Sequence, residues 1–383
     1  MKKGISLLLA VVLAFCFAAA GQAREFEQPQ LTLPCRAAVL IHQDTGTVLY
    51  QMNADTPMPI ASITKVMTLL LTMEALDEGR VSLDDIVPVS EHSYQMGGSQ
   101  IWLEPGEEFT LDQMLKAICV SSANDAAVAV AEFIGGSEEV FVEQMNQKAA
   151  QLGMTNTHFE NACGLDEEGH LSTAMDVAIM SREILTNHPR ITNYTTIWMD
   201  SLREGQTQLL NTNKLLKSYN GITGLKTGTT SGAGVCVTAS ASRDGLNLIA
   251  VVLGSSNGDD RWTAARTLLD YGFANFQSLE VERPQEAPVQ IPVEGGDRET
   301  LELSYSAGQR LLIKKGEGES LEITPQLPES LSAPIEEGQE VGRLQVSIQG
   351  QEMDSIPITA AHEVKKLDLF MALERLWLAF LTP

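Results

Sequence analysis

The chain has 383 residues, of which 44% are hydrophobic and 20% are charged, and its formal net charge at pH 7 is -24. A chain of this length and apolar content can bury a large core and divide into two or three domains. The acidic balance excludes nucleic acid as a partner, because a phosphate backbone is bound by a basic surface.

The first 23 residues are typical of a secretory signal peptide. Lys2 and Lys3 precede an apolar run from residue 5 to residue 20, and small residues follow around Ala23. We therefore expect an exported protein, on the outer face of the cytoplasmic membrane, in the periplasm or in the cell wall. Cleavage after Ala23 would also remove Cys16.

The remaining cysteines are widely spaced and form no C-x-x-C pair, so the sequence predicts no metal site. One or two disulfides would be compatible with an oxidising compartment, but so few cysteines make no disulfide scaffold in a long chain. We expect free, buried thiols at Cys35, Cys119, Cys163 and Cys236.

A hairpin is predicted ahead of the first helix, because strand-like residues 37–41 and 47–50 flank the turn at 44–46. The helix that follows carries Ser62 and ends at Gly79.

Ser62 and Lys65 lie three residues apart at the beginning of this helix, so Ser62 Oγ and Lys65 Nζ can come within hydrogen-bonding distance. A serine becomes a good nucleophile when a neighbour takes its proton, and a lysine can do so when burial and nearby cations lower its pKa. The apolar residues after Lys65 indicate such burial. Taken alone, the pair is more typical of a helix cap and an exposed lysine than of a catalytic site.

The region from about 80 to 200 is predicted to be mostly helical. Thr110 begins one helix, and Ser137 begins another that ends near Gly153. The polar residues Ser122 and Asn124 lie where one helix ends and the next begins, so their side chains can project into a cleft. By itself, Ser122 would be a plain N-cap.

Strands return after Lys226, at residues 235–240 and 248–253, and a long amphipathic helix follows at 260–276. One sheet with strands from both ends of a domain and a helical insertion between them fits this order, and we place that domain at residues 30–280. Just ahead of the strands, Lys226 offers a cation and Gly228 allows a substrate backbone to lie close. Alone, this stretch would be a turn.

Prolines and glutamates near residue 280 mark a linker. Short alternating runs follow it, so we predict a small all-β sandwich domain at 281–361, as a spacer or an interaction module. Residues 362–383 are predicted to hold a C-terminal amphipathic helix, spanning 364–381. It would lie in the membrane interface rather than cross the membrane, and the alternative is that it packs on its own β domain. Its apolar stripe is Leu369, Phe370, Leu373, Leu376, Trp377 and Phe380.

Three motifs occur in a characteristic order: S-x-x-K at 62–65, S-x-N at 122–124 and K-T-G at 226–228. Together they match the penicillin-binding proteins and serine β-lactamases. With the residues around them and residues 170–174, the chain most resembles the D-alanyl-D-alanine carboxypeptidases, which are low-molecular-mass penicillin-binding proteins. The resemblance covers nearly the whole chain. It implies an α/β (α+β) transpeptidase/β-lactamase-like catalytic domain with a helical insertion, then the small β domain and the terminal helix.

The resemblance also implies a role for each motif residue. Ser62 would be the acylated nucleophile and Lys65 its general base. Ser122, with Asn124, would relay protons and hold the peptide, and Lys226 would support the Ser122 hydroxyl and add positive potential.

The rest of the third motif would bind the substrate. Thr227 would hydrogen-bond the terminal carboxylate of D-alanine, and Gly228 would allow the close approach. The backbone N–H groups of Ser62 and Thr229 would form the oxyanion hole. One departure is Cys163, where relatives often carry His or Thr, and an inert small residue is the simpler interpretation than a reactive thiol.

Two alternative functions can be tested against the same residues. A class A β-lactamase needs a glutamate for deacylation, usually within an E-x-x-L-N run, and none occurs between Asn124 and Lys226. A non-catalytic wall-binding protein would have lost a motif side chain, and all are intact. The sequence therefore predicts a serine-type D-Ala-D-Ala carboxypeptidase without a cofactor. Its substrate would be peptidoglycan stem pentapeptide, and β-lactams would inhibit it covalently.

Overall fold

The computed structural model describes residues 26–306 and 310–373, and these residues form two compact units. The larger unit contains residues 26–282 and 310–320, and the smaller contains residues 283–306 and 321–373. Residues 310–320 therefore belong with the larger unit, although the predicted boundary near 280 would place them in the β domain. The reason is strand pairing, because β10 (Phe276–Glu280) pairs antiparallel with β13 (Arg310–Lys314). The predicted signal peptide lies outside the described residues.

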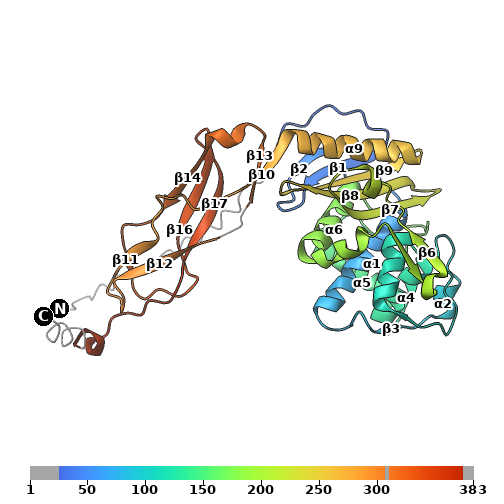
Figure 1. The fold of residues 1–383 in the computed structure, drawn as a ribbon, viewed down its shortest axis with the longest axis horizontal. Helices are drawn as coiled ribbons and strands as arrows, with labels where there is room; N and C mark the ends of the chain where they lie inside the picture. Colours follow the sequence, from blue (N-terminus) through green and yellow to red (C-terminus); the bar gives the residue numbers. More distant parts are fainter. Residues whose placement is uncertain (1–25, 307–309, 374–383) are drawn as a thin grey trace, which may run out of the picture. The chain divides into compact units, whose positions relative to one another are not determined.

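The larger unit is built on a five-stranded antiparallel sheet in the order β2-β1-β9-β8-β7 (Figure 1). Strands from both ends of the domain meet in it, which confirms the predicted mixed fold. The K-T-G motif lies inside β7, an edge strand, and not in a turn ahead of the strands. The five strands are β1 (Ala37–His42), β2 (Val48–Met52), β7 (Ile222–Thr230), β8 (Gly234–Arg243) and β9 (Leu246–Ser255).

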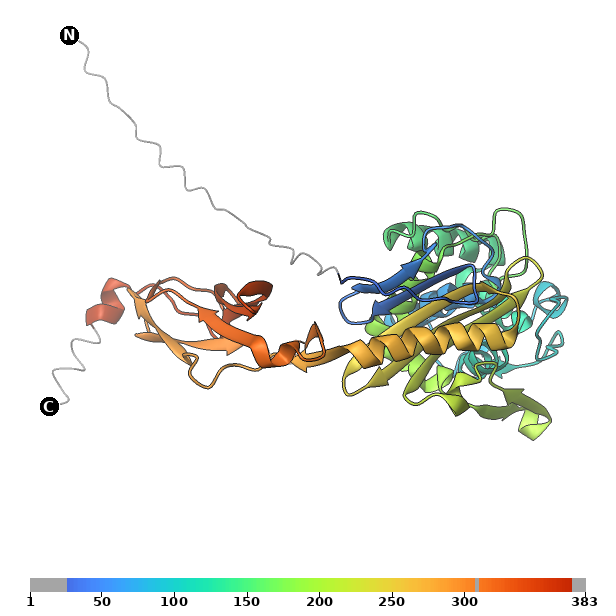
Figure 2. The same cartoon turned by 90° about the horizontal axis from the view of Figure 1, so that it is seen from above.

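Both faces of this sheet are covered, so its strands are apolar on both sides. In β1, Val39 packs into the core shared with the helical insertion, and its neighbour Leu40 packs into the core under α9 (Gly258–Asn275). Figures 1 and 2 show α9 along one face of the sheet, and Figure 1 shows α1 (Lys65–Asp77) and α6 (Ala174–Asn187) on the other side.

The helical insertion follows the predicted caps closely. Thr110 and Gln113 form a capping box at the start of α3, and the Ser137 side chain caps α5. Ser122 differs from its expected place, because it ends a π-helix, Ala117–Ser121, in the left-handed region with φ 61° and does not cap α4. The helices are α2 (Glu91–Tyr94), α3 (Leu111–Lys116), α4 (Asn124–Gly135), α5 (Glu138–Gln151), α7 (Thr192–Thr195) and α8 (Leu215–Ser218).

Two short strand pairs in this region were not predicted. They are β3 (Ile86–Val87) with β4 (Phe109–Thr110), and β5 (Met199–Leu202) with β6 (Thr207–Leu210).

The smaller unit is all-β, as predicted, with strand order β14-β16-β17-β12-β11-β15. The apolar runs read from the sequence fall on β12, β14 and β16. Alternating side chains of β12 and β16 are buried in its core, whereas those of β14 are at most partly buried. Its strands are β11 (Gln290–Glu294), β12 (Thr300–Tyr305), β14 (Leu321–Gln326), β15 (Leu331–Ser332), β16 (Glu340–Ile348) and β17 (Gln351–Ala360).

The predicted C-terminal helix begins later than expected. Val364 is fully buried and pairs with Ile335, so residues 364–368 extend along the β unit, and helix begins at Leu369. Leu369 and Phe370 are 72% and 81% exposed. Residues 374–383 lie outside the described part of the chain. Within residues 26–306 and 310–373, no helix combines the length and the apolar character needed to cross a membrane.

Candidate active site

Ser62 and Lys65 meet at the entrance to α1. Ser62 lies in a 3₁₀-helix, Ala61–Thr64, and Lys65 is the first residue of α1. Lys65 Nζ lies 3.0 Å from Ser62 Oγ, which is the contact that the three-residue spacing predicts. The Lys65 side chain is fully buried.

The other contacts of Lys65 are compatible with a neutral amine. Its Nζ donates to Asn124 Oδ1 and to the Cys163 carbonyl oxygen, each at 2.6 Å, and both oxygens can only accept. A neutral amine that donates to both oxygens keeps its lone pair for the Ser62 hydroxyl proton. Burial lowers the pKa of Lys65 from 10.5 to about 8, although Cys163 and Asp125 oppose this shift. The arrangement can therefore accept a proton from serine near neutral pH.

Ser122 and Lys226 form a second pair on the other side of the site. Lys226 Nζ donates to Ser122 Oγ at 2.7 Å and to the Thr227 carbonyl at 2.9 Å. The left-handed conformation of Ser122 turns its side chain out of the π-helix toward β7. Lys226 is 1% exposed, and burial, followed by repulsion from Lys65, lowers its pKa well below 10.5.

Asn124 and Asp125 hold the loop that borders the site. The Asn124 amide donates from Nδ2 to the Gly97 carbonyl at 2.7 Å, which leaves Oδ1 to accept from Lys65. Asp125 is buried, and its carboxylate accepts the backbone N–H groups of Ile101 and Leu103. These bonds fix the loop against the start of α4.

Strand β7 packs against the backbone of the Ser62 segment. A Cβ at Gly228 would lie 3.0 Å from the Ser62 backbone nitrogen and 2.8 Å from the Ile60 carbonyl oxygen, so a glycine is required at this approach. Thr227 is buried, and its hydroxyl donates to Thr212 Oγ1 at 2.7 Å. Thr229 is exposed. Three contacts thus bring the motifs together: Lys65 with Asn124, Ser122 with Lys226, and Gly228 with the backbone of Ser62.

The segment from 161 to 166 completes the site. Asn161 Oδ1 accepts the backbone N–H groups of Gly164 and Leu165, which shapes the turn that presents the Cys163 carbonyl to Lys65. Burial raises the pKa of the Cys163 thiol, which disfavours a reactive thiolate. Asp166 accepts from the Thr230 hydroxyl at 2.6 Å and so ties this segment to β7.

Sequence reasoning missed the roles of the Cys163 carbonyl and of Thr212. A backbone carbonyl has no side-chain signature, but the turn former Asn161 followed by Gly164 was a usable signal. The four cysteines within residues 26–306 and 310–373 are unpaired, and Cys35 is the one that is half-buried rather than buried.

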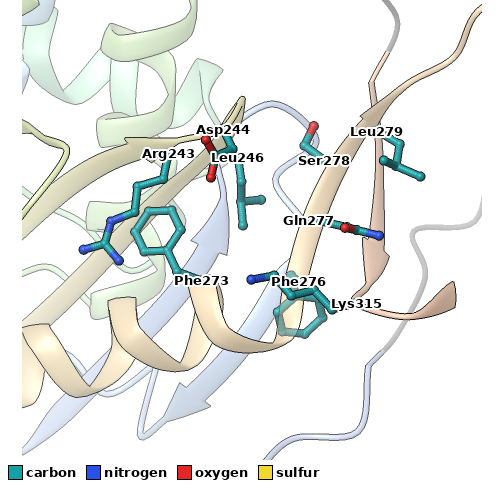
Figure 3. Close-up of a pocket in the computed structure, with 9 residues that line it drawn as sticks. All are labelled: Arg243, Asp244, Leu246, Phe273, Phe276, Gln277, Ser278, Leu279 and Lys315. Carbon is teal, nitrogen blue, oxygen red and sulfur yellow. The ribbon is translucent and has the colours of Figure 1, made fainter. Parts of the chain in front are cut away.

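One cavity and one side-chain cluster lie away from the three motifs. A cavity of about 540 Å³ is bordered by Arg243, Phe273 and Phe276 and contains no motif residue (Figure 3). Leu246, Phe273 and Phe276 belong to the core under α9, so this cavity lies across the sheet from Ser62.

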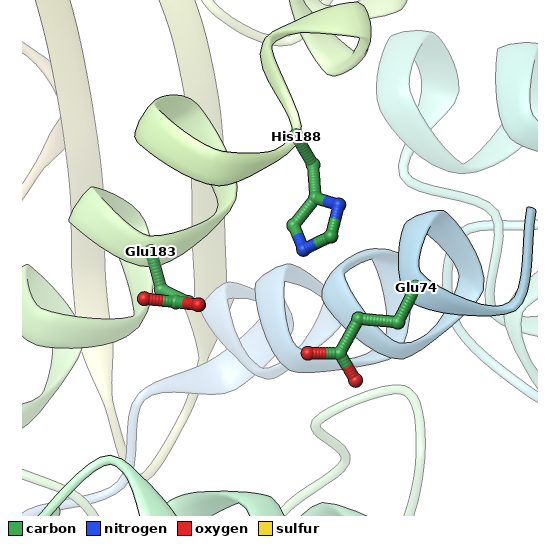
Figure 4. Close-up of side chains that lie close together, drawn as sticks. All are labelled: Glu74, Glu183 and His188. Carbon is green, nitrogen blue, oxygen red and sulfur yellow. The ribbon is translucent and has the colours of Figure 1, made fainter. Parts of the chain in front are cut away.

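Glu74, Glu183 and His188 are the residues of the described chain that come together as metal ligands would, with donor atoms within 4.8 Å of one another (Figure 4). Glu74 already pairs with Lys148 at 2.7 Å, and Glu183 accepts from Asn187 at 2.8 Å. Protein groups therefore satisfy these carboxylates, and the cluster forms an ordinary ion-pair and hydrogen-bond network.

Comparison with known proteins gives matches along nearly the whole chain. Residues 23–257 match the family model described as D-alanyl-D-alanine carboxypeptidase, and residues 276–366 match the model described as penicillin-binding protein 5, C-terminal domain. D-alanyl-D-alanine carboxypeptidase DacF of Bacillus subtilis is 42% identical over 381 residues, which is 98% of either chain.

The comparison with solved structures also finds penicillin-binding proteins. Penicillin-binding protein 5 from Haemophilus influenzae superposes with a TM-score of 0.76 at 28% identity and covers 88% of this chain and 99% of its own. Penicillin-binding protein D2 from Listeria monocytogenes, in its cefotaxime-bound form, has a TM-score of 0.60 at 33% identity and covers 64% of this chain and 100% of its own.

Proposed function

Because the chain belongs to the D-alanyl-D-alanine carboxypeptidase family, we propose that it performs the family reaction at the site around Ser62. It is a serine-type hydrolase that removes the terminal D-alanine from peptidoglycan stem peptides and binds β-lactams. The observation that carries the residue assignment is the environment of Lys65. Its amine is buried and donates hydrogen bonds to two oxygens that can only accept. It also lies within hydrogen-bonding distance of Ser62 Oγ.

Acylation begins when Lys65 Nζ takes the Ser62 proton and Ser62 Oγ attacks the carbonyl carbon of the penultimate D-alanine. The carbonyl oxygen becomes an oxyanion, and the backbone N–H groups of Ser62 and Thr229 stabilise it, by about 3 kcal/mol for each donor. The C–N bond then breaks. The departing nitrogen takes a proton from the Ser122 hydroxyl, and the proton that Lys65 took from Ser62 passes to Ser122 in its place, which leaves Lys65 neutral.

Hydrolysis of the acyl-enzyme uses the same groups. Lys65, neutral again, takes a proton from water, and the hydroxide attacks the ester and releases Ser62. With a β-lactam, the broken amide stays attached to the acyl group, so it remains in the site and slows the approach of water. The K-T-G residues Lys226, Thr227 and Gly228 hold the terminal residue of either ligand along β7.

The chain acts on peptidoglycan, outside the cytoplasm. We propose that residues 1–23 direct its export, that residues 30–280 hold the catalytic domain, and that residues 281–361, apart from 310–320, form a spacer. The C-terminal segment would attach the protein to the outer face of the cytoplasmic membrane. The exposed side chains of Leu369 and Phe370, with Lys365 and Lys366 just before them, support this interfacial role.

Replacement of Ser62 by alanine tests the assignment. We expect the purified variant to lose hydrolysis of a D-Ala-D-Ala peptide and covalent labelling by a fluorescent penicillin, while its thermal unfolding stays unchanged. Full labelling of the Ser62→Ala variant would contradict the assignment. If the unchanged protein folds but neither hydrolyses the peptide nor reacts with penicillin, the non-catalytic wall-binding alternative takes its place.

A further inference from the structure

His170 is a buried histidine that the proposed mechanism does not use. It is 3% exposed, and its ring packs edge-on against Phe159 with the ring centroids 5.7 Å apart. Its Nε2 lies 2.8 Å from the hydroxyl oxygen of Thr64, which stands between Ser62 and Lys65 in the first motif. His170 thus contacts, from 106 residues away in the chain, the segment that carries the nucleophile and its base.

The second nitrogen of the ring fixes the direction of this hydrogen bond. The backbone N–H of Glu160 donates to His170 Nδ1 at 3.1 Å, so Nδ1 uses its lone pair and carries no proton. A neutral imidazole then has its one proton on Nε2, and Nε2–H donates to Thr64 Oγ1. Burial lowers the pKa of His170 to about 4, so the ring is neutral at neutral pH.

The hydroxyl of Thr64 would ordinarily cap helix α1. Thr64 occupies the N-cap position, where a threonine normally accepts a backbone N–H of the first turn. Here Thr64 has helical dihedral angles, φ -44° and ψ -38°, and its side chain makes no capping bond. Its hydroxyl accepts the tertiary bond from His170 in place of a local one. The position of the α1 entrance therefore depends on a distant side chain.

One loop carries both His170 and the Cys163 carbonyl. A backbone bridge between residues 158 and 171 closes this loop, and Cys163 lies inside it. The Cys163 carbonyl accepts from Lys65 Nζ at 2.6 Å, while His170 donates to Thr64, the residue before that lysine. The loop therefore binds the α1 entrance at two adjacent residues, through a carbonyl at one and an imidazole at the other.

We propose that His170 is a positioning residue for acylation, which aligns the Ser62–Lys65 pair with the Cys163 carbonyl through its bond to Thr64. This rests on the proposed function of the site. Proton transfer from Ser62 to Lys65 needs hydrogen-bonding distance and alignment, and a misplacement of about 1 Å can cost on the order of 100-fold in rate. Without the imidazole bond the two segments around the amine can shift against each other, so proton transfer slows while ligand binding is unaffected.

Acylation by benzylpenicillin separates this role from a structural one. Rapid-quench mass spectrometry gives the acylation rate constant at saturation and the dissociation constant of the noncovalent complex. For His170→Phe, which keeps a ring against Phe159, we expect the rate constant to fall on the order of 10- to 100-fold and the dissociation constant to stay unchanged. His170→Gln keeps an acceptor and a donor separated by one carbon, as in the imidazole, and should recover most of the rate.

His188→Phe is the matched control. His188 Nδ1 lies 2.6 Å from a carboxylate oxygen of Asp77, the last residue of α1, so this histidine bonds to the opposite end of the same helix. The variant should acylate at the normal rate.

Thr64→Val removes the other partner of the bond and tests the proposal even if His170→Phe does not fold. It should slow acylation to the same extent, and the double variant should be no slower than either single variant, because both lose the same hydrogen bond. Falls that multiply in the double variant, or a normal rate in Thr64→Val, would overturn the role of His170. A loss confined to thermal stability would overturn it too, as would a fall in His170→Gln as large as in His170→Phe. All these results leave the proposed function standing, because that function fails only if the unchanged enzyme forms no adduct at Ser62.

Nitrogen-15 NMR of the unchanged enzyme checks the tautomer, with His170→Gln used to assign the ring signals. Nδ1 should show the shift of an unprotonated nitrogen and Nε2 that of a protonated one, with no titration down to about pH 5. Burial holds the pKa low; among the nearby charged groups Glu167 and Asp166 raise it and His158 lowers it. A proton on Nδ1, or titration near the ordinary pKa of 6.5, would contradict the direction of the bond.

Discussion

Replacement of Gly164 by alanine should disturb the nucleophile although residue 164 contacts no substrate. Gly164 has φ +85°, and a Cβ built on it would lie 2.0 Å from the Ala61 carbonyl oxygen and 2.9 Å from Thr64 Oγ1. These groups flank Ser62 in the 3₁₀-helix. The Thr64 hydroxyl cannot move away freely, because it is bonded to buried His170 at 2.8 Å.

The size of the effect follows from two separate contributions. A non-glycine residue in the left-handed region costs roughly 1–2 kcal/mol. Forcing an extra carbon into a packed site costs about 1–3 kcal/mol more. We therefore expect Gly164→Ala to lower the free energy of unfolding by about 2–5 kcal/mol. The Cys163 carbonyl should also move away from Lys65, which would slow acylation of Ser62.

Gly106→Ala is the matched control, because Gly106 has φ +89° and its Cβ would meet no atom within 4 Å. Gly106→Ala should lower the free energy of unfolding by the conformational contribution alone. It should react with fluorescent penicillin at the normal rate. Urea unfolding and time-resolved penicillin labelling measure the two effects. If Gly164→Ala unfolds and labels like Gly106→Ala, the close packing of residue 164 against the nucleophile is not what the geometry indicates.

Three further predictions concern the lysines and the carboxyl end. Lys65→Arg should lose acylation, because a guanidinium stays protonated, whereas Lys226→Arg keeps a cation and should retain measurable activity; equal acylation rates for the two variants would contradict this division. Because the neutral amine of Lys65 is the base and its pKa is about 8, the acylation rate should rise about tenfold per pH unit below that pH and level off above it, and a flat profile would refute the role. Truncation after Asp368, which keeps buried Val364 in place, should release the mature protein from sedimented membranes in active form. A full-length mature protein that is soluble without detergent and ignores anionic vesicles would refute membrane attachment.

The sequence predicted those features that depend on nearby residues. The Ser62–Lys65 contact follows from helical spacing, and the caps at Thr110 and Ser137 follow from side chains that accept a neighbouring backbone N–H. The hairpin of β1 and β2 follows from the polar turn between two apolar runs. In each case one turn of helix or one reversal of the chain contains the whole interaction.

The sequence did not predict features that depend on distant partners. Ser122 looked like a helix cap, yet it ends a π-helix in a left-handed conformation, and its hydroxyl bonds to Lys226, 104 residues away. The K-T-G residues looked like a turn because of their glycines, but pairing with β8 makes them a strand. Tertiary contacts overrode local preference at both places.

The same distinction explains why S-x-x-K is a weak motif by itself. An isolated helix with Ser62 and Lys65 would leave the amine in water, and its pKa would stay near the ordinary value of 10.5. The fold supplies what the spacing cannot, namely burial together with two oxygens from Asn124 and Cys163, which lie 59 and 98 residues away along the chain. Burial makes the neutral amine accessible near neutral pH, and the two oxygens orient its lone pair toward the serine. A change at Asn124 or in the turn at Cys163 should therefore impair Ser62 as much as a change in the motif itself.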